Sequence, residues 1–332
     1  MARYLITGGT GFLGVTLARR LLDAGHEVRV IARGRNAALI QRGALWTQGS
    51  ILDPALLNAA SLDVDGIFHL AGRVDHTRRH GFEDFRELHV HGTRAILERA
   101  SELGARVVYA STCGTVAVSR EPEIFGERAT YKDDLTAGWP YYLTKIEAER
   151  MALELAARDG IELVVMRPAL LLGPDDWHLS SSRTVLDFLD RKIPFVPPGG
   201  VNVVDVRDCA EVFETAMTRG APLSTYLIGA TNLTLAELFA RLATLSGVAP
   251  PRLKLPTPLA RLGAGLGARL MDLAGRQDPG LDPVVVELAA HFWYVDDAAA
   301  RADLGWRPRA LDDTLRDSIA WVRANREVLR AR

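Results

Sequence analysis

The chain has 332 residues, 48% hydrophobic and 24% charged, which is ordinary for a globular protein and sufficient for one large α/β domain or two joined lobes. Its formal net charge of −1 provides neither the basic surface expected of a nucleic-acid-binding protein nor a polybasic membrane anchor. The two cysteines, Cys113 and Cys209, form no disulfide framework and no metal-ligand spacing, so we expect a reduced, cytoplasmic protein without a metal site.

Short aliphatic runs alternate with helical patterns through the first half of the chain. The N-terminal run has no cleavage-type segment after it, so we expect a strand there rather than a signal peptide. Helices are predicted at residues 12–24 and 82–103 and from Tyr141, between the predicted strands RYLIT, EVRVIA, GIFHLA, RVVYAST and IELVVMRP. Near-continuous apolar strands separated by helices predict an α/β fold, a doubly wound parallel Rossmann sheet with both faces covered.

The alternation ends after Pro168, where proline-rich segments and less regular helices follow. We therefore expect residues 1–168, with parts of 200–230, to form a dinucleotide-binding domain. Residues 169–332 are expected to form a smaller, mostly helical substrate-binding lobe interleaved with it. Within that lobe, the apolar residues 253–275 contain prolines and two arginines, which predicts an amphipathic helix lining a pocket rather than a membrane span.

The sequence TGGTGFLG follows the first predicted strand and opens the first predicted helix. Gly8 permits a tight turn, Gly11 lets a pyrophosphate approach the backbone, and Gly14 lets helix and strand pack closely. Phe12 and Leu13 begin the helix, whose unpaired N–H groups and dipole favour an anion. The order of strand, loop and helix predicts that this segment binds a dinucleotide.

The same loop, followed in order by HLAG, HVHGT, RPALLLGP, DVRDCAEVF and ARADLGWRP, resembles the extended short-chain dehydrogenase/reductase family along nearly the whole chain. The chain is most similar to the dihydroflavonol-reductase-like, 3β-hydroxysteroid-dehydrogenase-like and hopanoid-associated epimerase-like groups of the wider NAD-dependent epimerase/dehydratase family. The resemblance implies an NAD(P)-dependent enzyme acting on CH–OH groups, often as a homodimer. It also implies cofactor contacts from Ile51, Leu70, Ala71, Gly72, His89 and Pro168.

The end of the second predicted strand bears on the choice of cofactor. Ala32 stands where an NAD-selecting fold carries an acidic residue for the ribose hydroxyls. Arg33 and Arg35 follow, and a guanidinium can bind a 2′-phosphate through charge-assisted hydrogen bonds. NADP(H) is therefore favoured, and NAD(H) is the alternative if both arginines are solvated loop residues. Ser50 departs from the family, whose members commonly have an aspartate there that contacts adenine.

Tyr141 and Lys145 match the family's Tyr-x-x-x-Lys pair, and residues four apart share one face of a helix. The lysine cation and the positive nicotinamide ring would lower the tyrosine pKa from about 10, so that Tyr141 can act as general acid or base. Matching the family's TSSxGTV motif to this chain places the catalytic hydroxyl at Thr112, with Ser111 the alternative. Tyr142 is expected to pack or to line the pocket.

Three histidines and a cysteine lie near these segments in the sequence. His89 replaces the asparagine of the family's NVxGT motif, and it either supports a proton route near the lysine or fills space. His76 and His80 are expected to be exposed loop residues rather than ligands, because no third metal ligand has suitable spacing. Cys113 has no evident base to activate it and is expected to be a small buried residue.

Leu170 stands where the family's nucleotide-sugar members carry an asparagine that binds the diphosphate. An apolar side chain cannot replace those hydrogen bonds, so the predicted substrate is a bulky hydrophobic ketone or alcohol, such as a sterol, flavonoid-like compound or β-keto lipid. A nucleotide-sugar epimerase or dehydratase and a non-catalytic NADP(H)-binding sensor are the alternatives. The pocket is expected to include Tyr142, Leu170, Trp177 and Phe195.

Overall fold

The computed structural model describes residues 1–77, 80–251, 253 and 282–331. Most of the apolar segment at 253–275, from residue 254 on, lies outside the described residues. None of the described helices is both long and apolar enough to span a bilayer.

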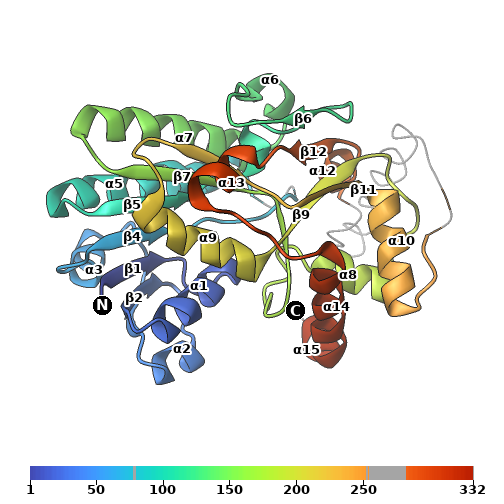
Figure 1. Ribbon diagram of the computed structural model, residues 1–332, viewed down its shortest axis with the longest axis horizontal. Coiled ribbons are helices and arrows are strands. Elements are labelled where there is room, and N and C mark those ends of the chain that lie inside the picture. The colour runs from blue at the N-terminus through green and yellow to red at the C-terminus, as the bar shows by residue number, and fades with distance from the viewer. Residues whose placement is uncertain (78–79, 252, 254–281, 332) are drawn as a thin grey trace.

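A parallel sheet forms the first part of the molecule, as predicted (Figure 1). In the described part of the chain it has seven strands, whose parallel pairing confirms the doubly wound fold class. Two of them, β3 (Leu45–Gln48) and β10 (Thr225–Ile228), are not among the predicted strands. Their order across the sheet is β10 (Thr225–Ile228), β7 (Leu163–Pro168), β5 (Arg106–Ala110), β4 (Gly66–His69), β1 (Arg3–Thr7), β2 (Glu27–Ala32) and β3 (Leu45–Gln48).

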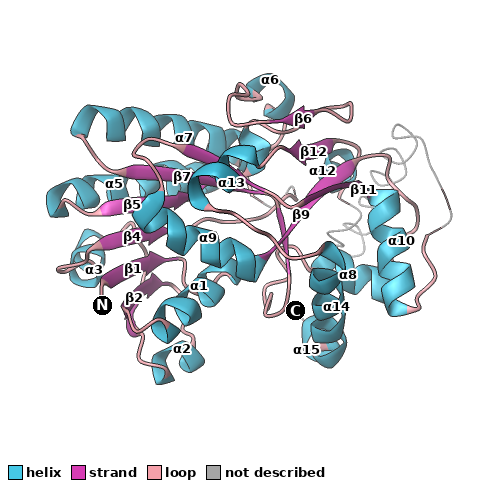
Figure 2. Cartoon of the chain, viewed as in Figure 1, coloured by secondary structure: helices cyan, strands magenta, loops and turns pink. Residues whose placement is uncertain are grey.

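Helices cover both faces of this sheet (Figure 2). The alternation of side chains along β1 sends Ile6 to one face, where it shares a hydrophobic cluster with α1 (Phe12–Asp23) and α9 (Val206–Arg219). Leu5 points to the other face and packs with a second cluster. That cluster is supplied by α3 (Pro54–Ala60), α5 (Gly92–Leu103) and α7 (Pro140–Asp159). Buried strands between two helical layers explain why the strands read as almost continuous apolar runs.

The helix predicted at 82–103 has three parts in the structure. It begins as α4 (Phe82–Arg86), widens into the π-helical turn η1 (Glu87–His91), and continues as α5. A π turn inserts one extra residue into the helical pattern, which apolar periodicity does not reveal, and such turns are frequent at functional sites. His89 lies in this turn.

A second sheet lies beside the first, and the C-terminal part that supplies most of its strands is otherwise largely helical, as predicted. Its strands come from distant parts of the chain, which local patterns cannot pair, and helices including α8, α10 and α14 pack with them. Among the described residues they are β11 (Thr231–Thr234), β9 (Gly200–Asp205), β12 (Phe292–Val295) and β6 (Ile124–Phe125), with β8 (Leu170–Leu172) also paired to β9. The other described elements are α2 (Ala37–Gln41), η2 (Cys113–Thr115), α6 (Asp133–Thr136), α8 (Arg183–Leu189), α10 (Leu235–Ser246), α12 (Pro283–Leu288), α13 (Ala298–Leu304), α14 (Leu311–Ala324) and α15 (Arg326–Arg330).

Candidate functional site

The glycine loop between β1 and α1 has the geometry of an anion-binding turn. Gly8 has φ of 74°, and a Cβ there would lie 2.8 Å from the backbone of Ala71. A Cβ on Gly14 would lie 2.4 Å from the Gly8 carbonyl oxygen. Gly11 caps α1 without a side-chain hydrogen bond, so N–H groups of the first turn, at Phe12 and the residues after it, are free to meet an anion. Side chains are thus excluded where a dinucleotide backbone would pass.

A series of buried hydrogen bonds holds the turn after β4 against the glycine loop. The Thr7 hydroxyl accepts hydrogen bonds from the backbone N–H groups of Leu70 and Ala71, at 3.2 and 3.0 Å. His69 lies 2.8 Å from Thr7 through Nδ1 and 2.9 Å from Thr93 through Nε2. Burial lowers the pKa of His69 to about 3, so the ring is neutral and acts as a structural bridge. Sequence reasoning missed this role, although a polar residue ending each of two apolar strands was a usable signal.

The loop after β2 presents two arginines beside the glycine loop. Ala32 is buried at the strand end, whereas Arg33 and Arg35 are exposed and show no ion pair within the described ranges. Between them, the Gly34 carbonyl accepts a 3.0 Å hydrogen bond from Trp46 Nε1. A Cβ on Gly34 would lie 3.5 Å from the methyl group of Thr10. The loop is therefore anchored next to the turn while both guanidinium groups face solvent.

The other residues expected to contact the cofactor lie along the same edge of the sheet. Ile51 is buried against Gly92, and Pro168 ends β7. A Cβ on Gly72 would lie 3.5 Å from His89 Nε2 and 3.6 Å from Lys145 Nζ. The residues present therefore fit a dinucleotide, whose pyrophosphate would lie on the loop from Gly8 to Gly14 and whose nicotinamide end would lie near Lys145.

Tyr141 and Lys145 lie in the first turns of α7, which begins at Pro140. Lys145 Nζ donates a 2.8 Å hydrogen bond to the Ala110 carbonyl, and burial lowers its pKa to about 8 against the opposing effect of Glu149. Burial raises the pKa of Tyr141, and a hydrogen bond with the Thr112 hydroxyl lowers it by a smaller amount. The predicted lowering of the Tyr141 pKa by Lys145 is not found in the protein without cofactor. A protonated Tyr141 at neutral pH suits a proton donor.

Glu149, which was not predicted from the sequence, forms hydrogen bonds close to Lys145 and Thr112. It is fully buried and forms an ion pair with the buried Arg167. It accepts hydrogen bonds from Ser111 and from Tyr131, the latter at 2.9 Å. Because Ser111 is engaged there, Thr112 is the hydroxyl that meets Tyr141. The spacing of eight residues between Tyr141 and Glu149, on one helical face, was the available signal.

His89 connects the π turn to α7. Its Nδ1 lies 2.9 Å from Thr144 Oγ1, and its Nε2 accepts from the Arg73 N–H at 3.1 Å. Burial is the main cause that holds the His89 pKa well below its ordinary value, and the positive charge of the nearby Lys145 adds to it. The same Nε2 also lies 3.1 Å from the Arg73 carbonyl oxygen, so the ring bridges the Arg73 backbone and Thr144.

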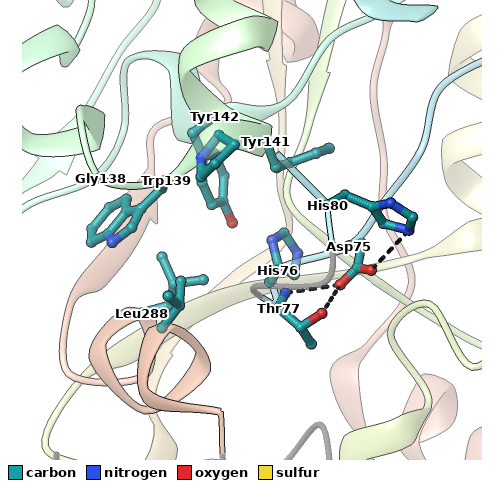
Figure 3. A pocket seen from close by; sticks show the side chains of 11 residues that line it. Asp75, His76, Thr77, His80, Gly138, Trp139, Tyr141, Tyr142 and Leu288 are labelled. Carbon is teal, nitrogen blue, oxygen red and sulfur yellow. Dashed lines mark hydrogen bonds and ion pairs between the residues drawn. The ribbon is translucent and has the colours of Figure 1, made fainter. Parts of the chain in front are cut away.

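A pocket of about 230 Å³ opens at Tyr141 (Figure 3). Its lining includes Tyr142 but not Leu170, Trp177 or Phe195, the other residues expected to line a substrate pocket. Leu170 and Trp177 pack with the cluster around β9 instead, and Phe195 is half-buried. The lining residues are Asp75, His76, Thr77, His80, Gly138, Trp139, Pro140, Tyr141, Tyr142, Val284 and Leu288.

His76 and His80 are not the exposed loop residues that were expected; both are half-buried. The His76 ring stacks on Tyr142, with ring centroids 5.4 Å apart and planes at 12°. It meets Tyr141 edge to face at 4.9 Å. Local sequence could not show this, because the contacts join the loop after β4 to the start of α7.

The remaining predictions concern the reactivity of Cys113 and the presence of a metal site. Cys113 is buried, and burial raises the pKa of its thiol to about 12, which keeps it an unreactive thiol. Within the described ranges, no group of three or more histidine, cysteine, aspartate or glutamate side chains could hold a metal ion.

The chain is similar to several known proteins over most of its length. A sequence model of the NAD-dependent epimerase/dehydratase family matches residues 4–229. A Synechocystis sp. protein provisionally named dihydroflavonol 4-reductase is 30% identical, over 96% of this chain and 94% of its own. Sterol demethylase protein B of Methylococcus capsulatus is 29% identical, over 96% of this chain and 98% of its own. The solved structure of a nucleoside-diphosphate-sugar epimerase from Pseudomonas aeruginosa is 26% identical, with a TM-score of 0.78 over 98% of both chains.

Proposed function

The chain belongs to the NAD-dependent epimerase/dehydratase family, and within it we propose an NADP(H)-dependent oxidoreductase that interconverts a bulky hydrophobic ketone and its secondary alcohol. The observation that carries this proposal is the position of Tyr141, which joins Thr112 on one side and a largely aromatic pocket on the other. Trp139, Tyr142 and Leu288 give that pocket an apolar wall suited to a ring system or an alkyl chain.

The residues around Tyr141 have complementary roles in the proposed reaction. A nicotinamide cofactor, when bound beside Lys145, would supply the hydride for the carbonyl carbon. Tyr141 donates its proton to the carbonyl oxygen, and Thr112 donates a hydrogen bond to the same oxygen as charge develops on it. Lys145, fixed on the Ala110 carbonyl, stabilises the tyrosinate that the transfer leaves behind. Oxidation of the alcohol uses the same groups in reverse.

The preference for NADP(H) rests on the loop after β2. A 2′-phosphate placed there would meet Arg33 and Arg35 and no carboxylate at position 32. We also propose that residues 1–168, with parts of 200–230, form the dinucleotide-binding domain and that residues 169–332 form the substrate lobe. The glycine loop and β10 belong with the sheet of residues 1–168, while Val284 and Leu288 bring the substrate lobe to the pocket.

A second candidate, a nucleotide-sugar epimerase, is favoured by one observation, the 26% identity to the Pseudomonas aeruginosa epimerase over nearly the whole chain. Against it, the lining of the pocket includes the Asp75 carboxylate and aromatic side chains, whereas a nucleoside diphosphate is bound best by cationic and polar partners. Leu170 likewise offers no hydrogen bond at the position of the family's asparagine.

The test is cofactor titration followed by turnover. We expect NADPH to bind more tightly than NADH, and hydrophobic ketones to be reduced with loss of the reduced-nicotinamide absorbance. Interconversion of a nucleotide sugar with no net change in the cofactor would establish the epimerase instead. Tight cofactor binding without turnover of ketones, alcohols or nucleotide sugars would point to a sensor.

A further inference from the structure

The pocket next to Tyr141 has a polar side, formed by the loop after β4. Most of its polar groups already have partners within that loop. The Asp75 carboxylate accepts from the Thr77 N–H at 2.8 Å and the Thr77 hydroxyl at 2.7 Å, and it faces His80 at 3.7 Å. Arg73 donates to His80 Nδ1 at 2.7 Å. Among the described lining residues, His76 differs in having a buried ring nitrogen that these contacts do not satisfy.

His76 Nδ1 is buried and has no hydrogen-bond partner among the described residues. A buried polar nitrogen without a partner costs free energy, and such a group in a native protein calls for an explanation such as a role in catalysis or a bound polar molecule. Two ring contacts, the stacking on Tyr142 and the edge-to-face contact with Tyr141, fix the imidazole beside the proposed proton donor. The same pocket is therefore lined by Tyr141 and by a second, rigidly held polar group.

We propose that His76 binds a second oxygen of the substrate, a hydroxyl or carbonyl one or two carbons from the carbonyl that Tyr141 protonates. This inference rests on the proposed reductase function and narrows its substrate class to α-hydroxy ketones and β-dicarbonyl compounds with a bulky apolar part. The His76 and Tyr141 rings, whose centroids are 4.9 Å apart, are close enough for one short segment of a substrate to lie against both.

The charge state of the pocket identifies the second oxygen as a neutral one. Burial lowers the pKa of His76 to about 4, an effect that the Asp75 carboxylate only partly opposes, so the imidazole is neutral at physiological pH. A neutral ring gains most from a hydroxyl or carbonyl, and the Asp75 carboxylate beside it repels a carboxylate. A free β-keto acid is accordingly a poorer ligand than its ester.

Matched substrate pairs test the role of His76 in the full-length protein with NADPH. One pair is flavanone and the dihydroflavonol that adds a hydroxyl next to the ketone; another is a long-chain ketone and the corresponding β-keto ester. The wild-type protein is expected to prefer the second member of each pair. In His76→Phe, which keeps the ring stacking, kcat/KM for the oxygenated member should fall about tenfold more than for its partner.

Controls separate recognition from structural damage. His80→Phe is expected to affect both members of a pair alike, because the His80 Nδ1 already accepts from Arg73. His76→Asn, which keeps an amide near the position of Nδ1, should restore part of the preference. If His76→Phe does not fold, as judged by NADPH binding, His76→Leu serves for the same comparison.

Unchanged discrimination in the His76 variants, or no wild-type preference for the oxygenated members, would overturn the inference and leave the reductase proposal standing. Wild-type protein that binds NADPH but turns over neither member of any pair would overturn the reductase proposal together with this inference.

Discussion

Replacing Tyr141 with phenylalanine removes the phenol oxygen and directly tests whether Tyr141 is the proton donor. The raised pKa of Tyr141 means that the wild-type phenol is protonated at neutral pH and ready to donate. In the variant, Lys145 remains on the same helical face, but its Nζ donates a hydrogen bond to the Ala110 carbonyl. Loss of a positioned general acid lowers kcat by about a hundredfold to ten-thousandfold, or about 3–5 kcal/mol in the barrier.

The variant Tyr142→Phe provides the matched control. Its ring keeps the stacking on Trp293, with centroids 4.8 Å apart, and on His76. We therefore expect at most a few-fold change in kcat. Tyr141→Phe itself should lose only about 1 kcal/mol of stability, from the hydrogen bond with Thr112. Ketone reduction followed by nicotinamide absorbance gives kcat, and fluorescence titration gives NADPH affinity, which should be nearly unchanged in both variants. Equal losses of kcat in the two variants, or a larger loss at Tyr142, would refute the assignment.

Three further predictions address the cofactor, the lysine and the buried ion pair. Arg33→Ala should weaken NADPH binding at least about tenfold more than NADH binding in parallel titrations, whereas equal weakening would exclude a 2′-phosphate contact. With the Lys145 pKa lowered to about 8, kcat/KM for NADPH should decline as the pH rises through about 8 and the ammonium is lost, and Lys145→Arg should abolish that decline. Between about 8 and about 10.5 the same shift makes the fold more stable with rising pH, because the unfolded lysine retains a proton that the folded one has released. Glu149→Gln leaves the buried Arg167 uncompensated and should cost about 3–5 kcal/mol in urea unfolding, a loss that Glu149→Leu with Arg167→Met should largely recover; a cost below about 1 kcal/mol for the single variant would contradict the pairing.

Features encoded by contiguous residues could be predicted from the sequence. The glycine loop was predictable because the strand, the turn and the helix that form it follow one another directly, and the structure shows the close backbone approaches at Gly8 and Gly14. The parallel sheet was predictable because both of its faces are covered, which makes each central strand apolar throughout. The spacing of Tyr141 and Lys145 placed them on one helical face.

Features that depend on long-range pairing could not be predicted in this way. β6 and β12 are adjacent strands in the second sheet, although about half the chain separates them in sequence. The burial of His76 results from its contact with a helix that begins more than sixty residues later. The pocket wall likewise depends on Leu288, whose place beside Trp139 is set by tertiary packing rather than by its neighbours in sequence.

The helix α7 carries Tyr141, Lys145 and Glu149 at intervals of four residues, and therefore spaces them by a fixed rise of about 6 Å per interval. A change of substrate preference during evolution cannot come from moving one of these groups alone, because the helix moves all three together. The pocket walls contributed by the loop after β4 and by α12 are free of that constraint. Substrate preference can therefore change through substitutions in the loop after β4 and in α12, while α7 keeps the reacting groups at the same spacing.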